Sequence, residues 1–307
     1  MNLDALPVLS LTADPASLAL GLGASFQRYG FALVQDHGLD PALALRGWEL
    51  TEAFFALPEA EKRRGHVLGG GGQRGYTPFG TEIAKGAAVH DLKEFWHVGR
   101  DAPGDAAMPA NVWPANPAGF RETFTKLYAE LDRIGARILS HIAVWLGLRP
   151  DWFDPEVAGG NSILRLLHYP PIPATTSGAI RAGAHEDINL ITLLLGAEEA
   201  GLELLTREGQ WIPAAPPPGA LVVNIGDMLQ RLANHILPST THRVRNPEGT
   251  RAAHSRYSMP FFLHLRSEFS ISTLPECISA ANPNRYPVPI TADAYLHERL
   301  REIGLTR

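Results

Sequence analysis

The chain has 307 residues, of which 45% are hydrophobic and 19% are charged, a composition typical of a globular protein with a sizeable core. Its formal charge is −5, from 27 basic and 32 acidic residues, with no basic block anywhere. A surface that follows nucleic-acid phosphates needs clustered lysine and arginine, so we expect no nucleic-acid partner. The single cysteine, Cys277, excludes an intrachain disulfide and a cysteine-based zinc or iron–sulfur site.

The first 15 residues have neither a basic start nor a long apolar segment, so they do not resemble a signal peptide. No stretch approaches the roughly 20 apolar residues that a membrane helix needs. We therefore expect a cytoplasmic protein without a membrane partner. An oligomeric state does not follow from the sequence.

Short strands alternate with helices in the first half, where we expect a strand at 7–11, a helix at 14–30, a strand at 31–35 and a helix at 40–57. Both helices begin with an Asp-Pro pair, which supplies an N-cap and a proline at the first helical position. The glycine run 69–72 predicts a flexible loop or lid. Apolar residues at steps of three or four predict a long helix between 116 and 147 that packs along a larger structure.

From about residue 161 the pattern changes to short apolar segments separated by turn residues, at 162–169, 190–195, 202–205, 220–225, 242–244 and 256–263. Such spacing is typical of a β-sandwich or barrel. We therefore expect a mainly β fold with flanking α, in which a jelly-roll core has the N-terminal helices packed outside it. The expected divisions are an N-terminal region 1–155 that does not fold by itself, a core 156–270, and an extension 271–307 with a short helix.

One tripeptide, His185-Glu186-Asp187, is expected to begin a strand, which would direct His185 and Asp187 to the same face. A later strand brings His242, 55 residues after Asp187. Two imidazoles and one carboxylate form the facial triad of non-haem Fe(II) oxygenases, which leaves coordination positions open. The tripeptide alone is a weak signal, because a surface turn would explain it equally well.

A second motif, Arg256-Tyr257-Ser258, lies 14 residues after His242 on another expected strand. Its first and third side chains share a face, which places a guanidinium and a hydroxyl inside the barrel. A buried arginine is costly without an anion, and its planar fork suits a carboxylate. The alternative is an arginine that reaches out to solvent beside an unrelated serine. The order and spacing of the two motifs together favour the site.

In this order the motifs resemble the isopenicillin N synthase-like branch of the Fe(II)/2-oxoglutarate-dependent oxygenases. The similar segments are 29–31, 91–94, 164–171, 183–194, 218–228, 241–244 and 256–262. The resemblance implies a double-stranded β-helix fold and Fe(II) ligation by His185, Asp187 and His242. It also implies that Arg256 and Ser258, with the Tyr169 hydroxyl, hold the distal carboxylate of 2-oxoglutarate.

Such an enzyme would couple oxidative decarboxylation of 2-oxoglutarate by dioxygen to hydroxylation, desaturation or cyclisation of a small molecule. Asp187 disfavours halogenation, because related halogenases lack this carboxylate. The alternative is an Fe(II) oxidase of the same branch that does not use 2-oxoglutarate and binds a substrate carboxylate at Arg256 and Ser258. A non-catalytic metal-binding barrel and a hydrolytic zinc enzyme are further alternatives; the latter lacks an evident general base.

Candidate substrate contacts are Arg74 and Tyr76, which follow the glycine run, and Phe262 on the last strand. A solvated loop and ordinary core packing explain these residues equally well. The segments 66–90 and 172–184 are expected to discriminate between substrates, whose identity the sequence does not give. Asn224 is expected near the cavity and Asp227 as a cap, whereas packing or capping is the expected role of four other histidines, His168, His235, His254 and His264.

Overall fold

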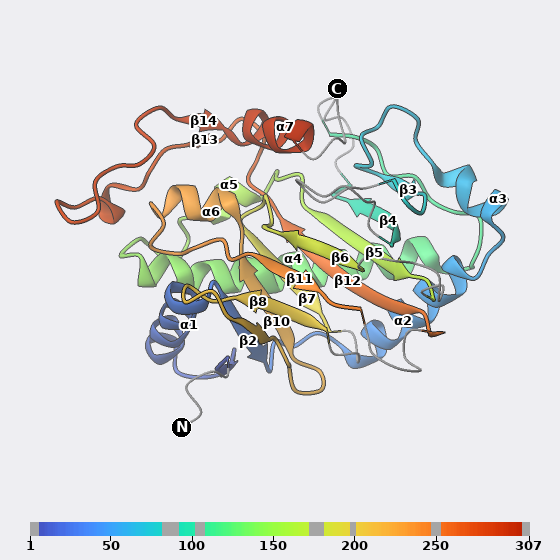
Figure 1. Cartoon of the computed structure of the whole chain (residues 1–307), viewed down its shortest axis with the longest axis horizontal. Helices are drawn as coiled ribbons and strands as arrows, with labels where there is room; N and C mark the ends of the chain where they lie inside the picture. The colour runs from blue at the N-terminus through green and yellow to red at the C-terminus, as the bar shows by residue number, and fades with distance from the viewer. Residues whose placement is uncertain are drawn as a thin grey trace.

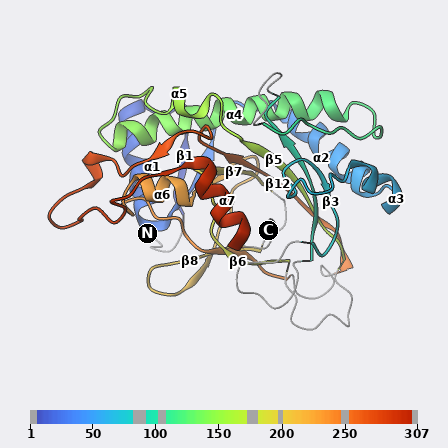
Figure 2. The ribbon, with the colours of Figure 1, turned by 90° about the horizontal axis from the view of Figure 1, so that it is seen from above.

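Figure 1 shows the computed structural model, which describes residues 6–81, 92–101, 108–171, 181–196, 201–246 and 253–302. Two β-sheets lie face to face, and a cluster of buried apolar side chains from both of them fills the space between. Helices cover the outer face of the larger sheet (Figure 2). The expected jelly roll with helices outside is thereby confirmed.

The larger sheet has eight strands within the described ranges. In spatial order they are β1 (Val8–Ser10), β2 (Phe31–Gln35), β10 (Leu221–Ile225), β7 (Ile191–Leu195), β12 (Arg256–Leu263), β5 (Ile163–Tyr169), β4 (Glu94–Gly99) and β3 (Gly75–Thr77). Among these strands only β1 and β2 pair in parallel. The central strand β10 is buried along its whole length, because helices cover one of its faces and the second sheet covers the other.

The smaller sheet has the order β6 (Ala182–His185), β11 (His242–Val244), β8 (Leu202–Leu205) and β9 (Trp211–Pro213). Its apolar side chains, such as Leu204 and Val244, meet Phe31 and Leu167 of the larger sheet. All of its pairs are antiparallel. The space between the two sheets is therefore lined by apolar side chains, and polar groups that enter it need hydrogen-bond partners.

The two N-terminal helices form as the capping residues predict. In α1 (Pro15–Tyr29) the Asp14 side chain accepts a hydrogen bond from the Ser17 backbone N–H, and the helix ends at Gly30, whose φ is 69°. In α2 (Pro41–Phe55) the Asp40 side chain accepts from the Ala42 N–H. A side chain at 30 would meet the Thr240 hydroxyl at 2.2 Å, so glycine is needed there for space as well as for conformation.

The long helix α4 (Phe120–Trp145) begins three residues after Pro117, where the sequence suggested its start. Gly119 precedes it with a φ of 83°, and this left-handed residue separates the proline from the regular helix. One face is buried against the larger sheet. At Gly135 the helix comes so close that an added Cβ would lie 2.4 Å from the Leu263 side chain.

Shorter elements connect these parts: α3 (Glu59–Lys62), η1 (Arg63–Gly65), α5 (Asp154–Val157), β13 (Ser270–Ile271), η3 (Pro275–Cys277) and β14 (Ile290–Thr291). The remaining two helices, α6 (Asp227–Leu232) and α7 (Ala292–Glu302), lie together beyond one end of the sheets (Figures 1 and 2). Among the helices described, none has the length and hydropathy needed to cross a membrane.

Candidate metal centre and adjoining cavity

Three side chains that can bind a metal converge at the end of the smaller sheet. His185 is the last residue of β6, His242 is the first residue of β11, and the two are paired in the antiparallel register. Asp187 follows two residues after His185. Its Oδ1 atom lies 3.8 Å from the Nε2 atom of each histidine, and one ligand atom from each residue lies within 4.8 Å of the others.

The backbone around Asp187 differs from the expected strand. Strand β6 ends at His185, and Asp187 lies in the connection to β7, so the argument from strand alternation was wrong. The connection is fixed by the start of α6: the Asp227 N–H donates to the Asp187 carbonyl at 2.7 Å, and the Gly226 N–H donates to the Leu190 carbonyl at 2.8 Å. Tertiary hydrogen bonds thus place the carboxylate beside the imidazoles.

Both imidazoles are held in the orientation that a metal requires. The Nδ1 atom of His185 lies 2.7 Å from the Gly183 carbonyl oxygen, and that of His242 lies 3.1 Å from the Thr240 carbonyl oxygen. A carbonyl oxygen only accepts hydrogen bonds, so each Nδ1 carries the proton and each Nε2 keeps its lone pair. Both lone pairs are on the nitrogens near Asp187, and the donor set therefore fits a divalent metal such as Fe(II).

The carboxylate of Asp187 is oriented through its second oxygen. Its Oδ2 atom accepts hydrogen bonds from Thr192 Oγ1 at 2.5 Å and from Asn224 Nδ2 at 2.8 Å. These two donors are paired neighbours on β7 and β10. They leave Oδ1 on the side of the histidines. Asn224 was expected near the cavity. The role of Thr192 was not foreseen, because its contact with Asp187 depends on the bend at 188–190 between the two residues.

The charge states suit metal binding at neutral pH. Burial opposes ionisation of Asp187, but the two histidines and the hydrogen bonds from Asn224 and Thr192 outweigh it, so its pKa is lowered. Burial, and then repulsion from His242, lower the pKa of His185 to about 4. The site therefore offers an ionised carboxylate and a neutral imidazole at His185.

The three residues that the sequence suggested for the distal carboxylate of 2-oxoglutarate lie near one another. Arg256 and Ser258 are buried on the same face of β12, with exposed fractions of 4% and 3%. Tyr169 is the register partner of Arg256 on β5, and the guanidinium carbon lies 5.1 Å from the centre of its ring. Tyr169 belongs to the same apolar cluster as Phe31, whose ring lies 5.5 Å from that of His242. Tyr169 and, through the strand register, Arg256 thus lie in the space between the two sheets.

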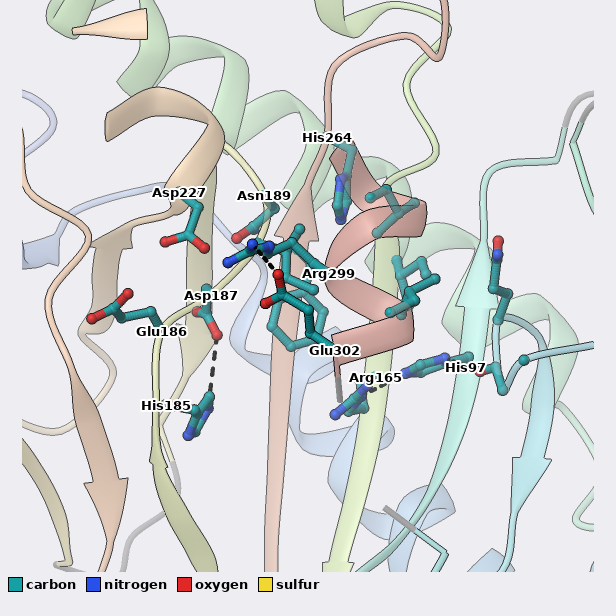
Figure 3. Close-up of a pocket in the computed structure, with 18 of the residues that line it drawn as sticks. His97, Arg165, His185, Glu186, Asp187, Asn189, Asp227, His264, Arg299 and Glu302 are labelled. Atoms are coloured by element: carbon teal, nitrogen blue, oxygen red, sulfur yellow. Dashed lines mark hydrogen bonds and ion pairs between the residues drawn. The ribbon is translucent and has the colours of Figure 1, made fainter. Parts of the chain in front are cut away.

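A cavity of about 370 Å³ opens beside the metal centre (Figure 3). His185 and Asp187 form part of its wall, and Leu296 and Leu300 of α7 contribute apolar side chains. Phe262 also lines it, as expected for a substrate contact. The cavity combines apolar surface with a few charged groups, which is typical of a site for a small organic molecule.

Arg74 and Tyr76 do not line this cavity, in contrast to the expectation. Arg74 is buried and donates to the Asn161 side chain at 2.8 Å. The Tyr76 hydroxyl is hydrogen-bonded to Glu94, and its ring packs against Phe54 in the core. Tyr76 lies on β3 and Arg74 directly precedes that strand; the glycine run before them could not reveal which way the two side chains point.

Some of the other residues singled out from the sequence line the cavity, and others do not. Asp227 begins α6 without a capping hydrogen bond from its side chain; it lines the cavity instead, and burial raises its pKa to about 6. His168 is buried and forms hydrogen bonds with the Glu94 carboxylate and the Ser255 hydroxyl. His264 is buried and lines the cavity. Residues 82–90 and 172–180, within the segments expected to select the substrate, lie outside the described residues.

Comparison with known proteins identifies the family. A model of the 2OG-Fe(II) oxygenase superfamily matches residues 160–265, and a model of the N-terminal region of the non-haem dioxygenase in morphine synthesis matches residues 6–116. A 2-oxoglutarate-Fe(II) type oxidoreductase of Emericella nidulans is 32% identical, over 92% of this chain and 83% of its own length. The chain belongs to the 2OG-Fe(II) oxygenase superfamily.

Solved structures agree with this assignment. A 2OG-Fe(II) oxygenase family protein from Caulobacter crescentus is 53% identical, with a TM-score of 0.90 over 98% of this chain and 99% of its own. A full-length Neurospora crassa protein, solved in complex with alpha-KG, is 29% identical, with a TM-score of 0.87 over 98% of both chains. This member of the 2OG-Fe(II) oxygenases is an enzyme, a dioxygenase that uses Fe(II), 2-oxoglutarate and dioxygen, as the sequence predicted.

Proposed function

We propose that His185, Asp187 and His242 bind the Fe(II) of this oxygenase, and that Arg256, Ser258 and Tyr169 hold 2-oxoglutarate. The observation that carries the metal assignment is the convergence of two Nε2 lone pairs with one carboxylate oxygen. When bound, Fe(II) and 2-oxoglutarate would allow dioxygen to oxidise the prime substrate, with 2-oxoglutarate as the co-substrate that is oxidatively decarboxylated. The chain's own residues fix the geometry and keep water out.

For 2-oxoglutarate, the support is a buried guanidinium and a hydroxyl on one face of β12. Arg256 offers a planar fork to the distal carboxylate, and Ser258 offers a hydroxyl donor two residues along the strand. Tyr169 flanks the guanidinium from β5 and brings a second hydroxyl to the same region. These groups bind and orient the co-substrate, and they take no part in breaking its bonds.

We propose that the prime substrate is a small molecule bound in the cavity beside His185, where it is hydroxylated, desaturated or cyclised. The cavity volume of about 370 Å³ suits such a ligand. Similar proteins include a proline hydroxylase of Petromyces alliaceus, 34% identical over 91% of both chains, and the Neurospora crassa protein, also solved with thymine. Of the three substrate contacts suggested by the sequence, Phe262 is supported because it lines the cavity. Arg74 and Tyr76 do not line it, so we do not propose them as substrate contacts.

The proposal also includes the expectations for the branch of the family, the cellular location, the partners and the division of the chain. We place the enzyme in the isopenicillin N synthase-like branch and in the cytoplasm, without nucleic-acid or membrane partners. A single buried cysteine, Cys277, fits a reducing compartment. The division into 1–155, 156–270 and 271–307 is kept, and strands β1 to β4 within the larger sheet support the view that 1–155 does not fold alone.

The experiment that tests the proposal measures succinate and oxygen consumption. Fe(II)-loaded protein with 2-oxoglutarate should form succinate slowly even without a prime substrate. Asp187→Ala should lower this rate at least about 100-fold, because it removes a ligand and leaves two imidazoles without their carboxylate. Asp151→Ala, at an exposed carboxylate paired with Arg149, serves as the control. Undiminished succinate formation by a folded Asp187→Ala protein would contradict the metal assignment.

A further inference from the structure

The strands that carry the proposed 2-oxoglutarate residues share a row of side chains on their opposite face. Glu94 of β4, His168 of β5 and Tyr257 of β12 are register partners across three neighbouring strands (Figure 1). Tyr257 packs against the apolar cluster under the helices, whereas Tyr169, the residue after His168, belongs to the cluster between the two sheets. The row therefore lies directly behind the proposed 2-oxoglutarate site.

A chain of hydrogen bonds runs through this row. Lys62 of α3 donates to both carboxylate oxygens of Glu94, at 2.9 and 2.8 Å, and the Tyr76 hydroxyl donates to the same carboxylate. The Nδ1 atom of His168 lies 2.7 Å from Glu94 Oε1, and its Nε2 atom lies 2.9 Å from the Ser255 hydroxyl. The chain thus reaches from α3 to the residue directly before β12.

The protonation of His168 follows from its acceptor. Burial opposes ionisation of Glu94, but the hydrogen bonds that it accepts, first those from His168 and Lys62, outweigh burial, so its pKa is lowered. An ionised carboxylate only accepts hydrogen bonds, so Nδ1 of His168 carries a proton. In the neutral ring the Ser255 hydroxyl then donates to Nε2. The ring is bonded on both sides, and the stacked Tyr257 ring, whose centre lies 4.8 Å away, further restricts its rotation.

The two strand positions that this chain joins are strand ends. Tyr169 is the last residue of β5, and two prolines follow it without an N–H for further pairing. Its register partner Arg256 is the first residue of β12. Because the ends of strands open more readily than their middles, backbone pairing alone holds these two residues weakly. The hydrogen bond between His168 and Ser255 joins the residue before Tyr169 to the residue before Arg256.

The hydrogen-bond chain includes an ion pair that stability alone does not explain. Lys62 and Glu94 are buried, with exposed fractions of 7% and 3%. A buried ion pair contributes little net stability compared with apolar side chains of similar size. A role in positioning does explain it, because the residues of a binding site have to be held to within about 0.5 Å by their neighbours.

We propose that His168 is a positioning residue for the 2-oxoglutarate site. Glu94 fixes its ring, and the ring holds Ser255, so the end of β5 and the start of β12 keep the spacing that the distal carboxylate needs. This role rests on the proposed function, because it assumes that Arg256 and Tyr169 bind that carboxylate. It extends the co-substrate site to the opposite face of the sheet, from which His168 acts through the two strands.

The test separates co-substrate affinity from metal affinity. Anaerobic titration of the Fe(II)-loaded protein with 2-oxoglutarate, followed by visible absorption, gives the dissociation constant of the co-substrate. Ser255→Ala removes one hydroxyl at a partly exposed position and should raise this constant about tenfold, as expected for one lost hydrogen bond. Ser255→Thr keeps the hydroxyl and should stay within about threefold of wild type. Ser272→Ala, at an exposed serine, is the control.

The two nitrogens of His168 have separate variants. A glutamine amide reaches about as far as Nε2, and an asparagine amide about as far as Nδ1. His168→Gln therefore keeps a partner for Ser255 and should stay within about threefold of wild type, whereas His168→Asn should raise the dissociation constant of 2-oxoglutarate about tenfold. At saturating 2-oxoglutarate both variants should form succinate at the wild-type rate, because only binding of the co-substrate changes.

Three results would overturn the positioning role. The first is a Ser255→Ala protein with the 2-oxoglutarate affinity of wild type. The second is an equal loss in His168→Gln and His168→Asn. The third is a loss of Co(II) affinity in the apoprotein as large as the loss of 2-oxoglutarate affinity, since a general loss of structure would affect both sites. Failure of the proposed function would be seen separately, because the wild-type protein itself would then show no absorption change with 2-oxoglutarate.

Discussion

Asn224 donates a hydrogen bond from Nδ2 to the Oδ2 atom of Asp187 at 2.8 Å, which leaves the other carboxylate oxygen beside the two histidines. Thr192 donates to the same Oδ2 atom from the neighbouring strand. The two donors hold the carboxylate in one rotamer and favour its ionised form. Loss of a group that orients a metal ligand in this way typically costs about 10- to 100-fold in metal affinity.

We predict that Asn224→Leu and Thr192→Val each weaken divalent metal binding by about 10- to 100-fold, because Asp187 loses one of its two orienting donors. Titration of the apoprotein with Co(II), followed by its visible spectrum, measures the affinity. Thr12→Val, at an exposed hydroxyl after β1, is the matched control. Affinities within twofold of wild type in both variants would show that the hydrogen bonds do not position Asp187.

We predict that Gly226→Ala lowers the free energy of unfolding by about 1–3 kcal/mol. We expect the same substitution to weaken metal binding. An added Cβ would lie 2.2 Å from the Asn189 carbonyl oxygen, in the connection that carries Asp187. Relief of this contact requires the backbone to move. Gly159→Ala is the control, because its Cβ would meet only the Arg266 Cβ at 3.9 Å. Urea unfolding measures the stability of both variants, and Co(II) titration measures their metal affinity. A Gly226→Ala protein with the stability and metal affinity of wild type would refute the role of this connection.

Acid should destabilise the apoprotein partly through His264. Burial, and then the charge of Arg74, hold its pKa near 4 against the attraction of Asp187, whereas the unfolded chain takes up this proton near pH 6.5. The unfolded state binds more protons between these values, so stability falls as the pH decreases from 6.5 toward 4. Between pH 7 and pH 5 the loss from this residue is about 2 kcal/mol.

The variant His264→Gln removes this ionisable group and should reduce the difference in unfolding free energy between pH 7 and pH 5 by about 2 kcal/mol. Urea unfolding of the apoprotein at the two pH values is the measurement. Thr12→Val, at an exposed group that does not ionise, should leave the difference unchanged. A pH dependence identical to that of wild type would mean that the native state protonates His264 as easily as the unfolded chain does.

Local signals in the sequence predicted much of the fold. The Asp14 and Asp40 caps, Gly30 and the apolar period of α4 are properties of a few neighbouring residues, and the helices begin or end within about four residues of the expected positions. Six strands, β5, β7, β8, β10, β11 and β12, followed from short apolar segments for the same reason, whereas β4, β6 and β9 were not predicted. Arg256 and Ser258 share a face because β12 is regular through both of them.

The features that the sequence did not reveal depend on contacts between distant segments. The Asp187 loop is shaped by backbone hydrogen bonds to α6, about 40 residues later, so strand alternation could not describe it. Asn224 reaches Asp187 only because β10 pairs with β7 in a particular register, and the Thr192 hydroxyl reaches it because the connection bends at 188–190. Tyr76 follows a flexible glycine run, and the direction of its side chain is set by pairing with β4.

The central claim is that Fe(II) at His185, Asp187 and His242 and 2-oxoglutarate at Arg256 and Ser258 share one site. The most direct measurement is an anaerobic titration of the Fe(II)-loaded protein with 2-oxoglutarate, followed by visible absorption. We predict a weak charge-transfer band that saturates with 2-oxoglutarate, is absent in Asp187→Ala, and needs a much higher concentration in Arg256→Ala. Bound Fe(II) without a band, or a band that Arg256→Ala leaves unchanged, would contradict the account.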